Sequence, residues 1–240
     1  MQSQFNSQLP ELRQQLPIGL GHALQLLEKT QGNVVAAAQL FKQEMIDLVV
    51  SKTSVEPHMA ERHLVKANYN VGSALQSIDV ERFTLTERIL LRYSTDNSEA
   101  LGHILLAIEE ASSLKRNYWL DISDLQKLNR PQACFALLCE WLNYEEWEGV
   151  FYAIYYHLDL VAVQLQQELQ QTALANNLLT MRERHTALQS IYPGKLSMAA
   201  TNSIAKDKLL QDYDAKFEQQ KPLLIERLLA YAREHISSFP

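Results

Sequence analysis

The chain has 240 residues and a formal net charge of −6 at pH 7, with 47% apolar and 21% charged residues. It contains only 7 glycines and 7 prolines, roughly half the usual share. Sandwiches, barrels and Rossmann folds need such residues at most corners, so the composition argues against them. It favours an all-α fold of long helices joined by short loops. The acidic balance argues against nucleic acid as a partner, because phosphate binding needs a basic face.

The N-terminal stretch MQSQFNSQLPELRQQL lacks the basic and apolar regions of a secretory signal. No segment approaches the run of about 18 apolar residues that a membrane-spanning helix needs. Cys134 and Cys139 lie five residues apart in a helical pattern and point in different directions, so we expect buried free thiols rather than a disulfide. These features predict a cytoplasmic protein with no membrane segment.

Two segments of the N-terminal third resemble each other when the chain is offset by 37 residues. They read LLEKTQGNVVAAAQLF from Leu26 and HLVKANYNVGSALQSI from His63. The pattern predicts a helix, a tight turn closed by asparagine, and a second helix that the asparagine caps. His63 stands where the first copy has Leu26, so we expect a partly buried histidine. The aligned pairs include Leu27 with Leu64, Lys29 with Lys66, Asn33 with Asn70, Val34 with Val71, Ala37 with Ala74 and Phe41 with Ile78.

These segments resemble the three-helix fold of ubiquitin-associated (UBA-like) domains, with one module at residues 9–43 and a second at 44–80. The second module is similar to the UBA-like domains of the alpha subunit of the nascent-polypeptide-associated complex and of elongation factor Ts. In that comparison the run Glu44-Met45-Ile46-Asp47-Leu48-Val49-Val50 is its first helix. The resemblance implies two small helical platforms for other proteins, and raises a translation- or ribosome-associated factor as one alternative.

The ubiquitin-binding members of this family carry a Met-Gly-Phe/Tyr loop between their first two helices. Here the loops read Pro17-Ile18-Gly19-Leu20 and Thr53-Ser54-Val55-Glu56, so ubiquitin is not the expected partner. We expect a protein partner to contact apolar side chains near the loops and the third-helix ends. The residues predicted for this contact are Ile18, Leu20 and Phe41 in the first module, and Val55, Met59 and Ile78 in the second.

Residues 84–240 are predicted to form a larger helical bundle. Thr84 and Glu87 form a capping-box pattern, and Ser98 is a candidate cap for the next helix. The last two helices should form a long antiparallel hairpin turned at Pro193-Gly194, with the apolar stripe of the second helix continuing through Pro222. The helices of this part are expected near 85–94, 98–115, 131–143, 145–157, 158–190 and 204–237, with a short helix within 116–130.

Seven aromatic residues gather in residues 141–156. The pattern admits two interpretations, an aromatic-rich core helix or the wall of a ligand pocket. In the second, Tyr144, Trp147, Tyr155 and His157 would surround a cavity, and the protein would be a small-molecule binder or an enzyme.

Titratable residues form no motif that names a reaction. Glu99, His103 and Glu110 share one helical face, but the spacing fits solvated ion pairs rather than a metal site. The run Arg182-Glu183-Arg184-His185 reads as a solvated face. No metal, cofactor or phosphate-loop motif is present in the sequence, and no catalytic residue is assigned. The leading prediction is therefore a non-enzymatic interaction or adaptor protein, whose long helices also offer a face for self-association.

Overall fold

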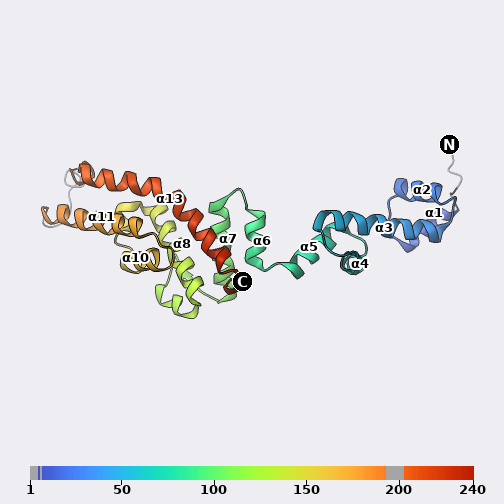
Figure 1. Ribbon diagram of the computed structural model, residues 1–240, viewed down its shortest axis with the longest axis horizontal. Helices are drawn as coiled ribbons and strands as arrows, with labels where there is room; N and C mark the ends of the chain where they lie inside the picture. The colour runs from blue at the N-terminus through green and yellow to red at the C-terminus, as the bar shows by residue number, and fades with distance from the viewer. Residues whose placement is uncertain (1–4, 6, 193–202) are drawn as a thin grey trace. The chain divides into compact units, whose positions relative to one another are not determined.

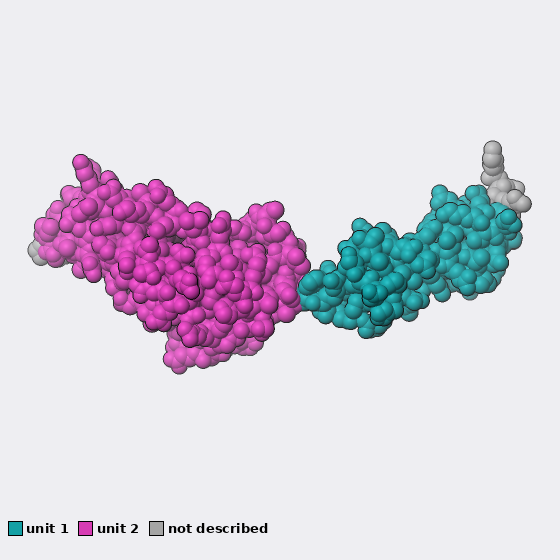
Figure 2. All heavy atoms as spheres, in the orientation of Figure 1, with its two compact units in different colours: residues 1–83 teal, residues 84–240 magenta. Residues whose placement is uncertain are grey.

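The protein is all-α in its computed structural model, which describes residue 5, residues 7–192 and residues 203–240. The chain divides into two compact units, residues 1–83 (unit 1) and residues 84–240 (unit 2), which Figure 2 shows in different colours. None of the helices within the described residues combines the length and the apolar character that crossing a membrane requires.

Unit 1 contains two small cores that share one long helix. Helix α3 packs against both α1 and α2 with its first part and against α4 and α5 with its second, as Figure 1 shows. The predicted boundary between residues 43 and 44 falls inside α3, which continues through it without a glycine or proline to end the helix. The buried residues of the first core end at Phe41 and those of the second begin at Ile46. The helices are α1 (Gln8–Gln15), α2 (Leu20–Lys29), α3 (Val34–Thr53), α4 (Pro57–Lys66) and α5 (Val71–Arg82).

The two helix corners of unit 1 repeat the same backbone 37 residues apart. Asn33 accepts a hydrogen bond from the amide of Ala36 at 3.0 Å, and Asn70 accepts one from the amide of Ser73 at 2.9 Å. The residue before each asparagine is left-handed, and its amide donates to the carbonyl five residues earlier at 2.7 Å. The predicted helix–asparagine–helix repeat is therefore confirmed; membership in the UBA-like fold stays a prediction.

The left-handed position is occupied by glycine in the first corner and by tyrosine in the second. Gly32 has φ +84° and Tyr69 has φ +57°. A non-glycine residue held there costs about 1 kcal/mol or more. The Tyr69 side chain packs against both cores of unit 1, with its ring 5.8 Å from the Phe41 ring. We infer that this packing offsets the backbone strain.

His63 takes the core position that Leu26 holds in the first copy, and it is only 2% exposed. Its Nδ1 lies 2.9 Å from the Ser77 hydroxyl and its Nε2 lies 3.0 Å from the Glu81 carboxylate. Both ring nitrogens therefore have polar partners, which is what a buried imidazole requires. The predicted burial of this histidine is confirmed and is nearly complete.

Unit 2 is built around α8, whose residues from Cys134 to Leu142 are all buried. A helix that is buried on every side lies at the centre of its domain, and α7, α9, α10 and α13 all pack against it. The elements are α6 (Leu85–Arg92), α7 (Asn97–Ala111), the paired strands β1 (Arg116–Asn117) and β2 (Trp119–Leu120), the 3-10 helix η1 (Ile122–Lys127), α8 (Arg130–Glu148), α9 (Val150–Ala153), α10 (Leu158–Gln167), α11 (Thr172–Ser190), α13 (Lys208–Glu234) and the 3-10 helix η2 (Ile236–Ser238).

Several helix ends in unit 2 differ from their predicted positions. Helix α8 continues past the predicted break near residue 144 and ends at Glu148, just before Gly149, whose φ of +85° suits glycine. The predicted helix 158–190 is instead two helices, separated around the left-handed Gln170. Helix α7 is capped by Asp96 rather than by Ser98, since the Asp96 carboxylate accepts the amide of Glu99. The capping box of Thr84 with its glutamate is confirmed.

Helix α13 is continuous through Pro222, as the apolar stripe predicts. It packs against α11, and Arg184 pairs with Asp207 while Asn177 donates to the carbonyl of Tyr213. Arg184, late in α11, thus contacts the residue that caps the start of α13, whereas Asn177, earlier in α11, contacts a residue further along α13. The predicted turn at Pro193-Gly194 lies outside the described residues.

Candidate functional site

The side chains predicted to contact partners in unit 1 mostly fill its cores. Leu20 is 53% exposed and Met59 is partly buried, whereas the other four are buried. The sequence pattern could not separate the two roles, because a loop-proximal apolar residue suits a core as well as a contact surface. The four residues that the structure assigns to the cores are Ile18, Phe41, Val55 and Ile78.

The four residues predicted to surround a pocket in unit 2 do not line one cavity. Tyr144 stacks on Tyr156, with ring centroids 4.0 Å apart, and Trp147 is 75% exposed. His157 is exposed and left-handed where α10 begins. A helix was expected over residues 145–157, but α8 ends at Glu148 and the chain turns at Gly149. Only Tyr155 lines the cavity described next.

The aromatic cavity of unit 2 has a volume of about 390 Å³, within the range of roughly 300–1,000 Å³ typical of ligand sites. Its walls come from the segment around α9, from the last turns of α11 and from the residues before α13. This cavity is defined by Phe151, Tyr152, Tyr155, His185, Gln189, Ile204 and Ala205.

The segment around α9 presents its aromatic side chains because its other face is anchored in the core. The indole nitrogen of Trp141 donates to the carbonyl of Ala153 at 2.9 Å, and both Ala153 and Ile154 are fully buried. With that face fixed, the intervening aromatic residues lie outward. Tyr152 and Tyr155 are exposed, with 65% and 45% of their surface accessible.

The cavity has one polar wall. The Tyr155 hydroxyl lies 2.9 Å from His185 Nδ1, 3.0 Å from the Thr186 hydroxyl and 3.4 Å from Gln189 Oε1. The Phe151 ring stacks on His185 with centroids 5.5 Å apart. Burial lowers the pKa of His185, which favours the neutral imidazole. The prediction of a solvated face at this position was therefore wrong for His185, which is half-buried.

Aromatic, aliphatic and amide groups make up this lining, and none of its residues is acidic, lysine or arginine. Such a surface suits an uncharged aromatic group, which can pack on the rings and bond to the polar wall. The sequence held a signal for the α11 wall, since His185 and Gln189 are four residues apart and so share one helical face.

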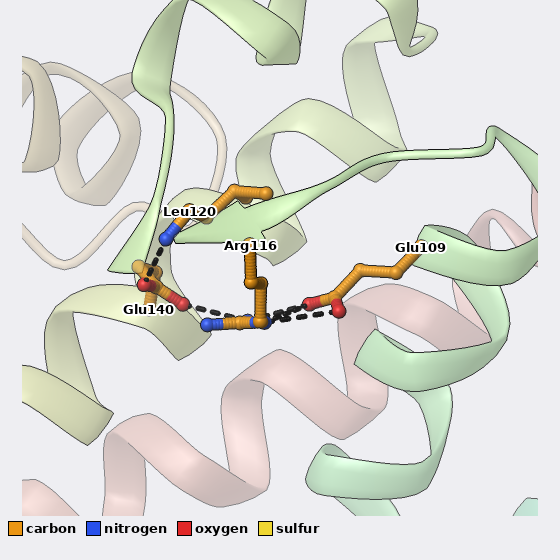
Figure 3. A network of polar contacts seen from close by, with 4 residues as sticks. All are labelled: Glu109, Arg116, Leu120 and Glu140. Atoms are coloured by element: carbon orange, nitrogen blue, oxygen red, sulfur yellow. Dashed lines mark hydrogen bonds and ion pairs between the residues drawn. The ribbon is translucent and has the colours of Figure 1, made fainter. Parts of the chain in front are cut away.

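Two buried carboxylates, Glu109 and Glu140, and the partly exposed Arg116 form a charge network that was not predicted from the sequence (Figure 3). Arg116 donates from Nε to both oxygens of Glu109 at 2.9 Å, and its Nη2 lies 2.8 Å from Glu140 Oε2. Glu140 is fully buried and also accepts the amide of Leu120 at 2.7 Å. The carboxylates of α7 and α8 thereby fix both strands of the β1–β2 hairpin.

The hairpin places Trp119 against the stacked tyrosines of unit 2. The Trp119 ring lies 5.0 Å from Tyr144 and 6.1 Å from Tyr156. Burial, with a further contribution from the nearby Glu140, raises the pKa of Tyr156 to about 12. Tyr156 follows the cavity residue Tyr155 directly, so the hairpin that the network fixes packs beside the cavity segment. We assign it a structural role.

The Glu99–His103 pair and the two cysteines, which the sequence singled out, show no sign of a chemical role. Glu99 pairs with His103 at 3.5 Å, which confirms the predicted helix-face ion pair. Cys134 and Cys139 are both free and buried, as predicted, and burial raises the pKa of Cys134 to about 12. The thiol form therefore prevails at neutral pH. Within the described residues, no group of three or more histidine, cysteine or acidic side chains is arranged to hold a metal ion.

Comparison with known proteins gives two matches. A family model described as "YfbN C-terminal domain" matches residues 84–237, almost the whole of unit 2. A protein of Escherichia coli (strain K12) with the name "Uncharacterized protein YfbN" is 33% identical over 234 residues, which cover 98% of this chain and 95% of the relative. No solved structure matches the chain.

Proposed function

This chain belongs to the YfbN family, and we propose that it is a non-enzymatic binding protein that docks a partner protein at the aromatic cavity of unit 2. The observation that carries the proposal is a ligand-sized cavity lined by exposed tyrosines, with one neutral polar wall. The matched family model spans the helices that form this cavity. The predicted adaptor role is thus kept, but its contact surface moves from unit 1 to unit 2.

The partner group that fits the cavity is an uncharged aromatic ring, such as a tryptophan or tyrosine side chain. Burying such a ring contributes about 2–3 kcal/mol, and a hydrogen bond to the polar wall about 1 kcal/mol more. A charged group would lose its hydration without gaining an opposite charge from the lining. The exposed Tyr152 and Tyr155 extend the contact surface, as tyrosines do in protein interfaces.

A peptide-binding measurement tests this function. Fluorescence anisotropy would follow a labelled Gly-Ser peptide with one central tryptophan, its tryptophan-to-alanine version, and free indole as competitor. The full chain should bind the first peptide, and binding should fall at least tenfold in the Tyr152→Ala/Tyr155→Ala variant. Trp147→Ala is the matched control, because this exposed aromatic residue does not line the cavity.

The alternatives give different results in that measurement. If free indole binds as tightly as the tryptophan peptide, the small-molecule interpretation is favoured. Equal binding of the tryptophan and alanine peptides, or an undiminished affinity in the tyrosine double variant, would overturn the proposed site.

A second candidate is docking through unit 1, supported by the exposed Leu20 and Val35, each in the first turn of its helix. Co-purification from the native host separates the two sites. A partner that is lost with Leu20→Glu/Val35→Glu but kept with Tyr152→Ala/Tyr155→Ala would assign the contact to unit 1. If the partner that is lost with Leu20→Glu/Val35→Glu proves to be a ribosomal particle, the translation-associated alternative raised by the UBA-like resemblance is favoured.

A further inference from the structure

A second cleft of unit 2 lies between α6 and α7, away from the residues of the aromatic cavity. Its volume is about 270 Å³. Two arginines of α6, Arg88 and Arg92, line it together with His103, and two half-exposed leucines, Leu85 and Leu106, add an apolar surface. The cleft therefore combines cationic and apolar groups.

The two arginines differ from most others in unit 2. Arg116, Arg130, Arg182, Arg184 and Arg227 each contact a carboxylate, whereas no ion pair within the described residues includes Arg88 or Arg92. Arg88 Nε makes only a long contact, 3.4 Å, to the carbonyl of Thr84, and the Arg92 guanidinium lies over the Tyr93 ring. Two like charges one helical turn apart repel each other.

Two carboxylates around the cleft have partners other than these arginines. Glu87 accepts the amide of Thr84 at 2.7 Å in the capping box. Glu99 pairs with His103. Glu110 is the one acidic residue among those lining the cleft, and its contribution opposes an anionic ligand. Arg88 and Arg92 thus outnumber the single acidic residue of the lining, so the cleft carries a net positive charge.

We propose that this cleft binds an acidic, leucine-bearing segment of a partner protein. The guanidinium groups present paired N–H donors that match the two oxygens of a carboxylate, and the leucines accept an apolar side chain beside it. The cleft shares no residue with the aromatic cavity, so this proposal does not depend on the proposal for the cavity.

Fluorescence anisotropy with a labelled amphipathic peptide of leucine and glutamate tests the site in the full chain. The matched probe replaces every glutamate with glutamine. The Arg88→Gln/Arg92→Gln variant should bind the glutamate peptide at least tenfold more weakly, and higher salt should weaken binding in the unchanged protein. Glu110→Gln should strengthen binding, because it removes the opposing charge. Arg233→Gln is the control, since Arg233 is an exposed arginine outside the cleft.

The tryptophan fluorescence and melting temperature of each variant would show that unit 2 stays folded. Weaker binding in the double arginine variant together with tighter binding in Glu110→Gln supports the proposal. Equal binding of the glutamate and glutamine peptides, or an equal loss in Arg233→Gln, would overturn it. Inorganic phosphate that displaces the peptide at micromolar concentration would also overturn it, because a phosphate site would then be the better description.

Discussion

Among the described residues, the large apolar side chains that unit 1 exposes are aliphatic, whereas unit 2 also exposes aromatic ones. In unit 1 the two copies of the repeat each pack around a small core of their own. Four of the six predicted contact residues fill these two cores. In unit 2 a single larger core centred on α8 leaves Trp147, Tyr152 and Tyr155 exposed. The comparison shows that exposure after folding, and not apolar character in the sequence, separates a candidate contact surface from a core.

The units also differ in what holds them together. Unit 1 has two apolar cores, with a single buried polar side chain, His63, among its described residues. Unit 2 buries carboxylates of α7 and α8 around one arginine. Apolar cores lose stability in proportion to the atoms removed, whereas a buried charge network fails when one partner leaves.

The largest effect is expected from Arg116→Met in unit 2. It leaves Glu140, and much of Glu109, as buried carboxylates without a counter-ion, so the free energy of unfolding should fall by about 3–5 kcal/mol. Urea unfolding followed by tryptophan fluorescence would measure it, because all three tryptophans lie in unit 2. The control is Arg182→Met, which breaks an ion pair to the exposed Asp159 and should change stability far less. Equal losses would refute the network's structural role.

Leu64→Ala in unit 1 should reduce stability by about 2–5 kcal/mol, because it leaves a cavity in a core where the side chain is fully buried. Native-state hydrogen exchange would locate the loss in α4 and α5. Trp147→Ala in unit 2 removes a larger side chain but should stay within about 0.5 kcal/mol of the unchanged protein. A loss above 2 kcal/mol in Trp147→Ala would show that this tryptophan is not the solvent-facing residue described above.

His63→Leu gives the second core of unit 1 the residue that the first core has at Leu26. We expect a gain of about 1 kcal/mol, because the leucine adds apolar burial while Ser77 and Glu81 are exposed and can bind water. Hydrogen exchange in α4 would report it, with His63→Ala as the destabilised control. A variant less stable than the unchanged protein would mean that the hydrogen bonds of His63 outweigh the packing of leucine.

The smallest effect concerns pH and His185. Burial lowers the pKa of His185 in the folded state, so the unfolded chain binds more protons below about pH 6.5. The contribution of the neutral histidine is therefore present above that pH and is lost as the pH falls further. The melting temperature of His185→Gln should decline less between pH 7 and pH 5 than that of the unchanged protein. Identical pH profiles would place His185 in solvent.

Much of the fold follows from local sequence. The asparagine caps, the capping box at Thr84 and the stripe through Pro222 depend on residues within a few turns, and the structure contains each of them. The errors occur where tertiary contacts decide. Gly149 ends α8 five residues after the predicted break, and the split at Gln170 has no proline or glycine to announce it.

The cavity was only half predictable, since its walls come from three separate segments of the chain, within residues 151–155, 185–189 and 204–205. The aromatic cluster indicated Tyr155, but which neighbours turn inward depends on the Trp141 contact to Ala153. Arg116 gave no signal, because an arginine between two predicted helices reads as a solvated loop residue until the carboxylates of two separate helices are placed beside it.

The most direct test of the central claim, that unit 2 accepts an aromatic group in its cavity, is nuclear magnetic resonance of the full chain with ¹⁵N-labelled histidine rings. Titration with the tryptophan peptide should shift the ring signals of His185, which lines the cavity, and leave those of the buried His63 in unit 1 unchanged. A titration to millimolar peptide that leaves the His185 signals in place would contradict the account.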